Sequence, residues 1–210
     1  MKTDAIIFDL DGTLWETLDS TYEATKEVTS KYNLDEITKE TISKCMGMTK
    51  KECAKTYYPN LELKKAEELL KEGLEINNKR LEKYGGNVYP GLEKTLKELK
   101  NDYKLAIVSN CAAGYIESFL KSSGLEIYFD DFLAAGQLGL EKKEAIKEII
   151  KRNDLKNAVY VGDTIRDKEA AIGANIEFIH AKYGFDQNLE HKYQIENISD
   201  LPKYLKTINK

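Results

Sequence analysis

The stretch Ile6-Ile7-Phe8-Asp9-Leu10-Asp11-Gly12-Thr13-Leu14 lies close to the N-terminus and decides how the rest of the chain is interpreted. An apolar run that begins at Ala5 ends at two aspartates, which are followed by a glycine. This pattern predicts a buried strand that leads into a loop. Because alternate side chains of an extended chain lie on one face, Asp9 and Asp11 can point toward the same pocket.

Two carboxylates in one pocket repel each other, so the pattern predicts a cation beside them. Mg²⁺ is a hard cation that prefers oxygen ligands. In open parallel α/β sheets, ligands bind at the carboxyl ends of the strands, which is where this pair is expected to lie. An acidic turn is the simpler interpretation of Asp-x-Asp-Gly alone, but the longer phrase through Leu14 is more specific.

The composition is that of a globular chain with a sizeable core. The chain has 210 residues, of which 41% are hydrophobic and 32% charged, and its net charge is 32 − 36 = −4. This mildly acidic balance argues against nucleic acid as a partner. No apolar run is long enough for a membrane span or a signal peptide. The three cysteines, Cys45, Cys53 and Cys111, show no disulfide or zinc spacing, so we expect a reducing cytoplasm.

Residues 15–84 have helical patterns. The apolar stripe from Leu18 to Tyr32 follows helical spacing, and Thr49 with Glu52 fits a capping box. A long charged helix is expected over 63–84, ended by Gly85-Gly86. We therefore expect a helical cap domain over residues 15–87, with hinges at 15–17 and 85–90.

The remaining chain alternates helices with strands, which predicts a doubly wound parallel α/β sheet of the Rossmann-like type. The core domain is expected to comprise residues 1–14 and 88–210. After the first strand, the predicted strands are residues 105–108, 132–135, 158–161 and 176–179. A helix is expected over 199–208, and residues 183–197 are expected to be irregular.

Polar residues that suit phosphoryl transfer occur in four segments, three of them at predicted strand ends. These segments are Asp9 with Asp11, Ser109-Asn110, Lys142, and Gly162-Asp163-Thr164-Ile165-Arg166-Asp167. Because parallel strands end at one edge of a sheet, all four segments can converge there.

Each residue type has a use in this chemistry. Asp9 can attack phosphorus and form an aspartyl-phosphate, while Asp11 can protonate the leaving oxygen and later accept a proton from water. Ser109 can donate a hydroxyl hydrogen bond, and Lys142 a positive charge. Asp163 can add a metal carboxylate. Taken singly, each is more easily explained as a turn, a surface lysine or a helix cap, and Lys143 competes with Lys142 for the inward position.

Residues 8–14, Phe-Asp-Leu-Asp-Gly-Thr-Leu, resemble the first motif of the phosphatase branch of the haloacid dehalogenase superfamily, and the other segments match its later motifs in order. The resemblance implies a Mg²⁺-dependent phosphatase similar to phosphoglycolate phosphatases. The implied catalytic residues are Asp9, Asp11 and Lys142; the metal residues are Asp9, Asp11 and Asp163; the phosphate-binding residues are Asp11, Ser109, Asn110 and Lys142; and the supporting residues are Thr13 and Asp167. Lys143 departs from the proline that many relatives have after the lysine of the third motif.

Several alternatives stay open at this point. A phosphosugar mutase would use the same aspartates, and a phosphonate-cleaving enzyme would need a cap lysine such as Lys50 or Lys51. A phosphate-binding signalling module would resemble a receiver domain, but it would lack the helical insert. The expected partner is a small phosphorylated metabolite, with no nucleic acid or membrane, and the chain is expected to be a monomer or homodimer. The loop 47–51 could face the substrate or could be a solvated helix start.

Overall fold

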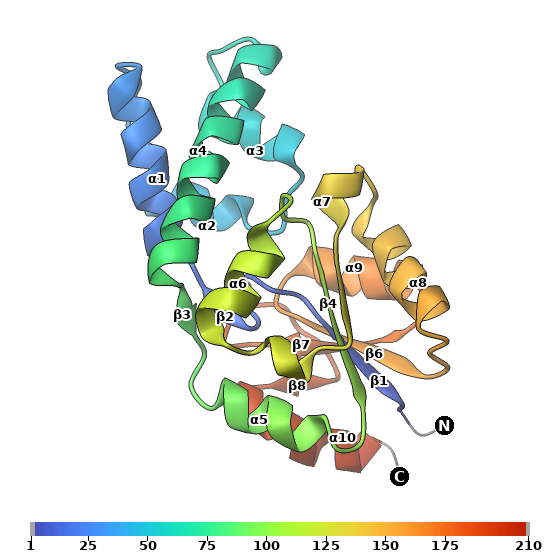
Figure 1. Cartoon of the computed structure of the whole chain (residues 1–210). Coiled ribbons are helices and arrows are strands. Elements are labelled where there is room, and N and C mark those ends of the chain that lie inside the picture. The colour runs from blue at the N-terminus through green and yellow to red at the C-terminus, as the bar shows by residue number, and fades with distance from the viewer. Residues whose placement is uncertain (1–2, 209–210) are drawn as a thin grey trace.

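A parallel six-stranded sheet forms the centre of the computed structural model, which describes residues 3–208; the ends of the predicted core domain, residues 1–2 and 209–210, lie outside this range (Figure 1). The strands are ordered β5-β4-β1-β6-β7-β8, and every neighbouring pair is parallel. Their bounds are β1 Ala5–Phe8, β4 Lys104–Ser109, β5 Asp131–Ala134, β6 Ala158–Gly162, β7 Glu177–Ala181 and β8 Gln194–Ile195. The predicted fold class is confirmed.

The register of the three central strands positions the site. Phe8 at the end of β1 pairs with Ile107 of β4 on one side and Val161 of β6 on the other. All four residues of β1 are buried, as expected for a strand covered on both faces. Strands β1, β4 and β6 therefore end at almost the same level, at one edge of the sheet.

Helices cover both faces of the sheet (Figure 1). The hydrophobic core on one face includes residues of α5, α6 and α10, and the core on the other includes residues of α8 and α9. The bounds are α5 Leu92–Leu99, α6 Tyr115–Ser123, α7 Ala135–Leu138, α8 Lys142–Arg152, α9 Ile165–Gly173 and α10 Leu201–Ile208, with short 3-10 turns at Glu126–Tyr128 and Ile198–Asp200.

Four further helices, which we call the cap, pack around a hydrophobic core of their own. They are α1 Leu18–Lys31, α2 Lys39–Cys45, α3 Lys50–Tyr57 and α4 Leu63–Tyr84. The predicted capping box is confirmed: the Thr49 hydroxyl accepts a hydrogen bond from the Glu52 backbone, and the Glu52 carboxylate accepts one from the Thr49 backbone. The helix predicted over 63–84 is also confirmed.

Two short strands connect the cap to the sheet, where the sequence predicted none. Strand β2, Trp15–Glu16, pairs antiparallel with β3, Asn87–Val88. At Gly86, between α4 and β3, a Cβ would lie 2.8 Å from a ring carbon of Trp15, so a larger residue would clash with the buried indole. The helical pattern therefore does not begin at Trp15. The division into domains at residues 14 and 87 stays a prediction.

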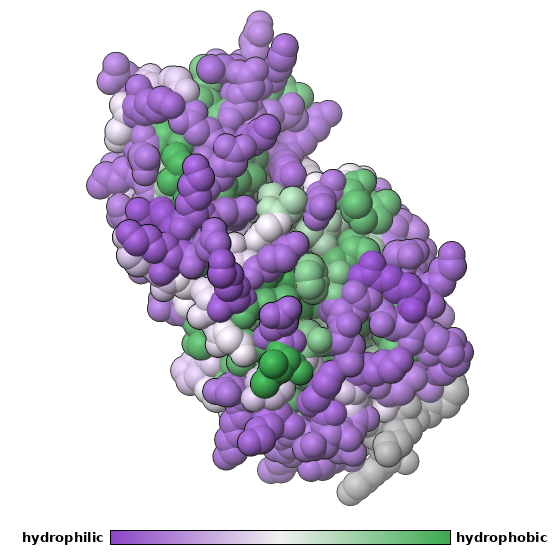
Figure 2. Space-filling view, viewed as in Figure 1, coloured by the Kyte–Doolittle hydropathy of each residue, from purple (hydrophilic) through white to green (hydrophobic). Residues whose placement is uncertain are grey.

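The segment 183–197 was expected to be irregular, but it contributes the edge strand β8, in which Gln194 pairs with His180. A two-residue strand carries no readable alternation of apolar and polar residues. Within residues 3–208, no helix is both long and apolar enough to span a membrane. The visible face is largely hydrophilic, with hydrophobic residues gathered near α7, where Leu138 is 58% exposed (Figure 2).

Candidate active site

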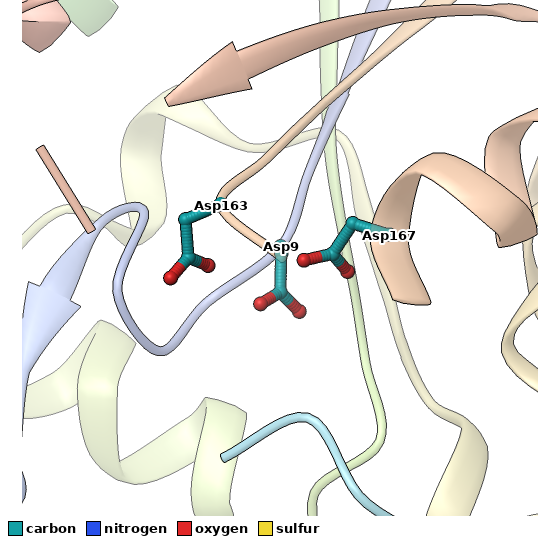
Figure 3. A group of neighbouring side chains, drawn as sticks. All are labelled: Asp9, Asp163 and Asp167. Carbon is teal, nitrogen blue, oxygen red and sulfur yellow. The ribbon is translucent and has the colours of Figure 1, made fainter. Parts of the chain in front are cut away.

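Three buried aspartates meet at the carboxyl edge of the sheet (Figure 3). Asp9 follows β1, Asp163 follows β6, and Asp167 lies in the first turn of α9. One carboxylate oxygen from each lies within 4.8 Å of the others, and Asp9 stands between the other two in this view. Oxygen donors of this kind suit a hard divalent cation.

Lys142 is the positive charge among these carboxylates. Its Nζ lies 2.7 Å from Oδ1 of Asp9 and 2.6 Å from Oδ1 of Asp167, and its side chain is buried. Lys143 instead extends to the surface, where its Nζ lies 2.5 Å from Oε2 of Glu141. The structure therefore brings the first of the two neighbouring lysines to the site.

The site carries more negative than positive charge. Burial, and then the neighbouring charge of Asp167, raise the pKa of Asp9 to about 7, although Lys142 acts in the opposite direction. Burial and the same neighbour raise the pKa of Asp163 well above its ordinary value. Burial alone would lower the pKa of Lys142, but the charges of Asp167 and Asp9 hold it well above its usual value. A bound divalent cation would relieve the repulsion between the carboxylates.

The start of α9 fixes Asp167. Its Oδ2 accepts hydrogen bonds from the Thr164 backbone at 3.0 Å and from the Thr164 hydroxyl at 2.6 Å. Its Oδ1 is therefore directed toward Lys142. Gly162 is required beside it, because a Cβ there would lie 2.6 Å from the Cβ of Asp167. The sequence predicted Asp167 as a supporting residue; the structure groups it directly with Asp9 and Asp163.

Asp163 is held from two sides. The hydroxyl of Thr13 donates to its Oδ1 at 3.3 Å, and the backbone N–H of Phe185 donates to its Oδ2 at 2.7 Å. Thr13 was predicted as a supporting residue. Phe185 was not, because it lies in a loop after β7 and a backbone donor leaves no sequence signal.

Asp11 is hydrogen-bonded to two hydroxyl groups. Its Oδ1 accepts hydrogen bonds from the hydroxyls of Thr17, at 2.9 Å, and Tyr115, at 2.7 Å. Burial raises the pKa of Asp11, and the bonds from Tyr115 and Thr17 partly offset this. The sequence predicts Asp9, Asp11 and Asp163 as the metal residues, and this assignment stays a prediction; the carboxylates grouped within 4.8 Å are those of Asp9, Asp163 and Asp167. Neither Tyr115 nor Thr17 was foreseen.

Ser109 is the last residue of β4 and Asn110 follows it, and both line the same cavity as Asp9, Asp11 and Lys142. The Ser109 hydroxyl accepts a hydrogen bond from the backbone of Cys111 at 3.3 Å. The Asn110 amide donates to the backbone carbonyl of Gly47 at 2.9 Å, so it reaches the cap. The cavity lies between the sheet edge and the cap, with Gly47 and Met48 also lining it.

Residues 6–181 match the family of haloacid dehalogenase-like hydrolases, and the chain belongs to this family. The predicted family and the predicted class of enzyme, a phosphatase, are thereby confirmed. The non-catalytic signalling module is set aside.

Individual relatives are similar over most of their length. A phosphoglycolate phosphatase of Nitrosospira multiformis is 24% identical over 192 residues, covering 87% of this chain and 85% of the relative. The pyrophosphatase PpaX of Bacillus cereus is 26% identical over 172 residues, covering 80% and 77%. The solved structure of a haloacid dehalogenase-like family protein from Streptococcus pneumoniae has the same fold, with a TM-score of 0.84, 20% identity, and coverage of 97% of this chain and 98% of that one.

Proposed function

We propose that the protein hydrolyses a small phosphate monoester in a Mg²⁺-dependent reaction that passes through an aspartyl-phosphate on Asp9. The observation that carries the proposal is the position of Asp9. Its carboxylate lies on the cavity floor, 2.7 Å from the Lys142 ammonium, beside two further buried carboxylates. Phosphoryl transfer needs this combination of a positioned nucleophile and fixed positive charge.

In the first step, a carboxylate oxygen of Asp9 attacks phosphorus, and the bond from phosphorus to the ester oxygen breaks. Asp11 gives its proton to the departing oxygen. In the second step, Asp11 accepts a proton from water as the water oxygen attacks phosphorus, which releases phosphate and restores Asp9. The hydroxyls of Thr17 and Tyr115 orient Asp11 for both transfers.

Asp9, Asp163 and Asp167 fit a magnesium site by their donor chemistry, since all three are buried oxygen donors with one ammonium among them. When bound there, Mg²⁺ supplies positive charge against the phosphate oxygens. Lys142 would share that task and hold Asp9 in place, while Ser109 donates to the phosphate. The side-chain amide of Asn110 is bonded to Gly47, so the loop that carries Asn110, and not this amide, supports the same phosphate.

The substrate is proposed to be a small phosphorylated metabolite, because relatives of similar length are named as phosphatases of small molecules. Because these relatives are named as phosphatases, we prefer hydrolysis to the reaction of a mutase or of a phosphonate-cleaving enzyme. The cytoplasmic location and a monomeric or homodimeric state stay predictions.

The test is phosphate release from an aryl phosphate and a panel of phosphorylated metabolites, with Mg²⁺ or with a chelator. Release should require Mg²⁺ and should fall by roughly 10⁴-fold in Asp9→Asn, because a nucleophile is lost. Asp102→Asn is a matched control that removes an exposed carboxylate. Release by Asp9→Asn at the wild-type rate would refute the assignment.

A further inference from the structure

The cavity above Asp9 extends into the cap, and its cap side is largely apolar. Helix α4 contributes three leucines to this wall, and the segment from α2 to α3 contributes two methionines and an aromatic ring. These residues are Leu69, Leu70, Leu74, Met46, Met48 and Tyr57. A leaving group bound above the phosphate would therefore contact mainly carbon atoms.

Three of the polar side chains on the cap side are hydrogen-bonded within the cap. The hydroxyl of Thr25 donates to the backbone carbonyl of Thr21 at 2.7 Å. The amide of Asn77 donates to the Thr21 hydroxyl at 3.1 Å, and its carbonyl oxygen accepts from Ser20 at 2.7 Å. The bonds of Asn77 join α4 to α1, whereas the bond of Thr25 lies within α1. A substrate would compete with these bonds to use the same polar groups.

Positive charge is scarce in this cavity. Of the described residues that line it, Lys142 and Lys50 are the cationic ones. Lys142 is bound between Asp9 and Asp167. Lys50 is exposed, and its ammonium donates to the carbonyl oxygen of Gly136 at 3.2 Å. A second anionic group that reached past Lys50 into the cap would lie against the apolar wall, where an unpaired carboxylate is costly to bury.

The cavity is also small, with a volume of about 120 Å³. An apolar protein cavity of about 150 Å³ accepts one benzene-sized ring. A compact leaving group suits this part of the cavity, and the flexible side chains of Met46 and Met48 can adjust to its shape.

We propose that the preferred substrate is a phosphate ester whose leaving group is uncharged, compact and apolar, and that Leu74 helps to set this preference. The inference rests on the proposed phosphatase function and narrows its substrate class. It separates this chain from an enzyme that selects a carboxylate-bearing ester such as phosphoglycolate.

The test compares kcat/KM for benzyl phosphate with kcat/KM for phosphoglycolate at one Mg²⁺ concentration. Both esters release a primary alkoxide, so they differ chiefly in the charge and size of the attached group. We expect benzyl phosphate to be preferred at least tenfold. Equal rates or a preference for phosphoglycolate would overturn this inference and leave the phosphatase function intact. Release from neither ester, nor from an aryl phosphate, would overturn the proposed function and the inference with it.

Leu74→Lys places a cation in the apolar wall, and Leu74→Met is the matched neutral control. The lysine variant should move the ratio of the two kcat/KM values toward phosphoglycolate at least tenfold, while the methionine variant keeps it within about threefold. Inhibition by inorganic phosphate should be the same in all three proteins, because it reports on the cavity floor. An unchanged ratio in a folded Leu74→Lys variant contradicts the role of Leu74; if that variant does not fold, the wild-type ratio still decides the substrate class.

Discussion

The sheet edge and the cap line the same cavity with opposite chemistry. The sheet edge presents the charged groups of Asp9, Asp11 and Lys142 to the cavity, with the buried carboxylates of Asp163 and Asp167 beside Asp9. The cap presents leucines and tyrosines from its helices, and methionines from the segment between α2 and α3. The comparison suggests a division of labour in which the sheet edge performs the reaction and the cap selects the leaving group.

Few polar contacts between the described residues join the two regions close to the cavity. The Asn110 amide reaches Gly47, the Lys50 ammonium reaches Gly136, and the guanidinium of Arg166 binds Glu52. If the division of labour is right, a substitution at the sheet edge should lower the activity toward every substrate. A substitution in one of these joining contacts should change the free energy of unfolding only slightly.

After the loss of Asp9 itself, the largest effect is expected from Lys142→Met. Its ammonium is the shared partner of Asp9 and Asp167, so its loss should lower kcat/KM by roughly 10³-fold for every ester. It should also lower the free energy of unfolding by about 3 kcal/mol, because buried carboxylates lose their partner. Enzyme kinetics and chemical denaturation measure the two effects.

Lys143→Met is the matched control, since Lys143 is the next residue and pairs with the exposed Glu141. Its activity and stability should stay close to wild type. Equal losses in the two variants would show that the sheet edge does not depend on the buried lysine in particular.

A smaller, substrate-dependent effect is expected from Asp11→Asn. The variant cannot protonate the leaving oxygen, so hydrolysis of an alkyl phosphate should fall by roughly 10²-fold or more. For an aryl phosphate, whose leaving group needs less protonation, the rate of the first step should fall less. A comparison of single-turnover rates for the two esters measures the difference. Equal losses for both would show that Asp11 is not the general acid.

The smallest effect is expected from Glu52→Gln, which weakens the contact between cap and α9. Hydrogen bonds from Thr49, and then from Arg166, lower the pKa of Glu52 to about 2. Because the folded-state pKa is below the ordinary value, the stabilisation is present above about pH 4.5 and is lost as the pH falls toward 2. The side chains of Arg166 and Glu52 are 37% and 44% exposed, so solvent screens the pair and its contribution should be below about 1 kcal/mol.

The measurement is the difference in unfolding free energy between wild type and Glu52→Gln, at pH 6 and at pH 3. Glutamine can keep the capping box with Thr49, so the change isolates the charge. The difference should shrink at the lower pH. Glu67→Gln, which changes another exposed cap glutamate, is the control. A difference that grows toward pH 3 would contradict the sign of the shift.

The sequence predicted the site residues of the sheet edge better than the apolar residues that the cap contributes to the cavity, for a physical reason. Asp9 and Asp163 follow apolar strands and Ser109 ends one. Because the carboxyl ends of parallel strands lie at one edge of a sheet, order along the chain was enough to bring the three residues into one site. The choice of Lys142 over Lys143 also agrees with the structure, because Lys142 begins α8 and faces inward.

Contacts between distant segments could not be predicted. Tyr115 reaches Asp11 from α6, and Phe185 reaches Asp163 through a backbone N–H. The pairing of β2 with β3 joins two-residue strands on either side of the cap. Such features depend on how segments pack in three dimensions, and neither hydrophobic periodicity nor local turn chemistry encodes them.

The central claim, that Asp9 is the nucleophile, is tested most directly by trapping its phosphorylated form. Asp11→Asn is mixed with an aryl phosphate and Mg²⁺, quenched in acid, and its peptides are analysed by mass spectrometry. Because the second step needs Asp11 as base, the phosphorylated enzyme should accumulate, with the phosphoryl group on Asp9 and none when Asp9 is also changed to Asn. Turnover with the phosphoryl group on another residue, or undiminished by the loss of Asp9, would contradict the account.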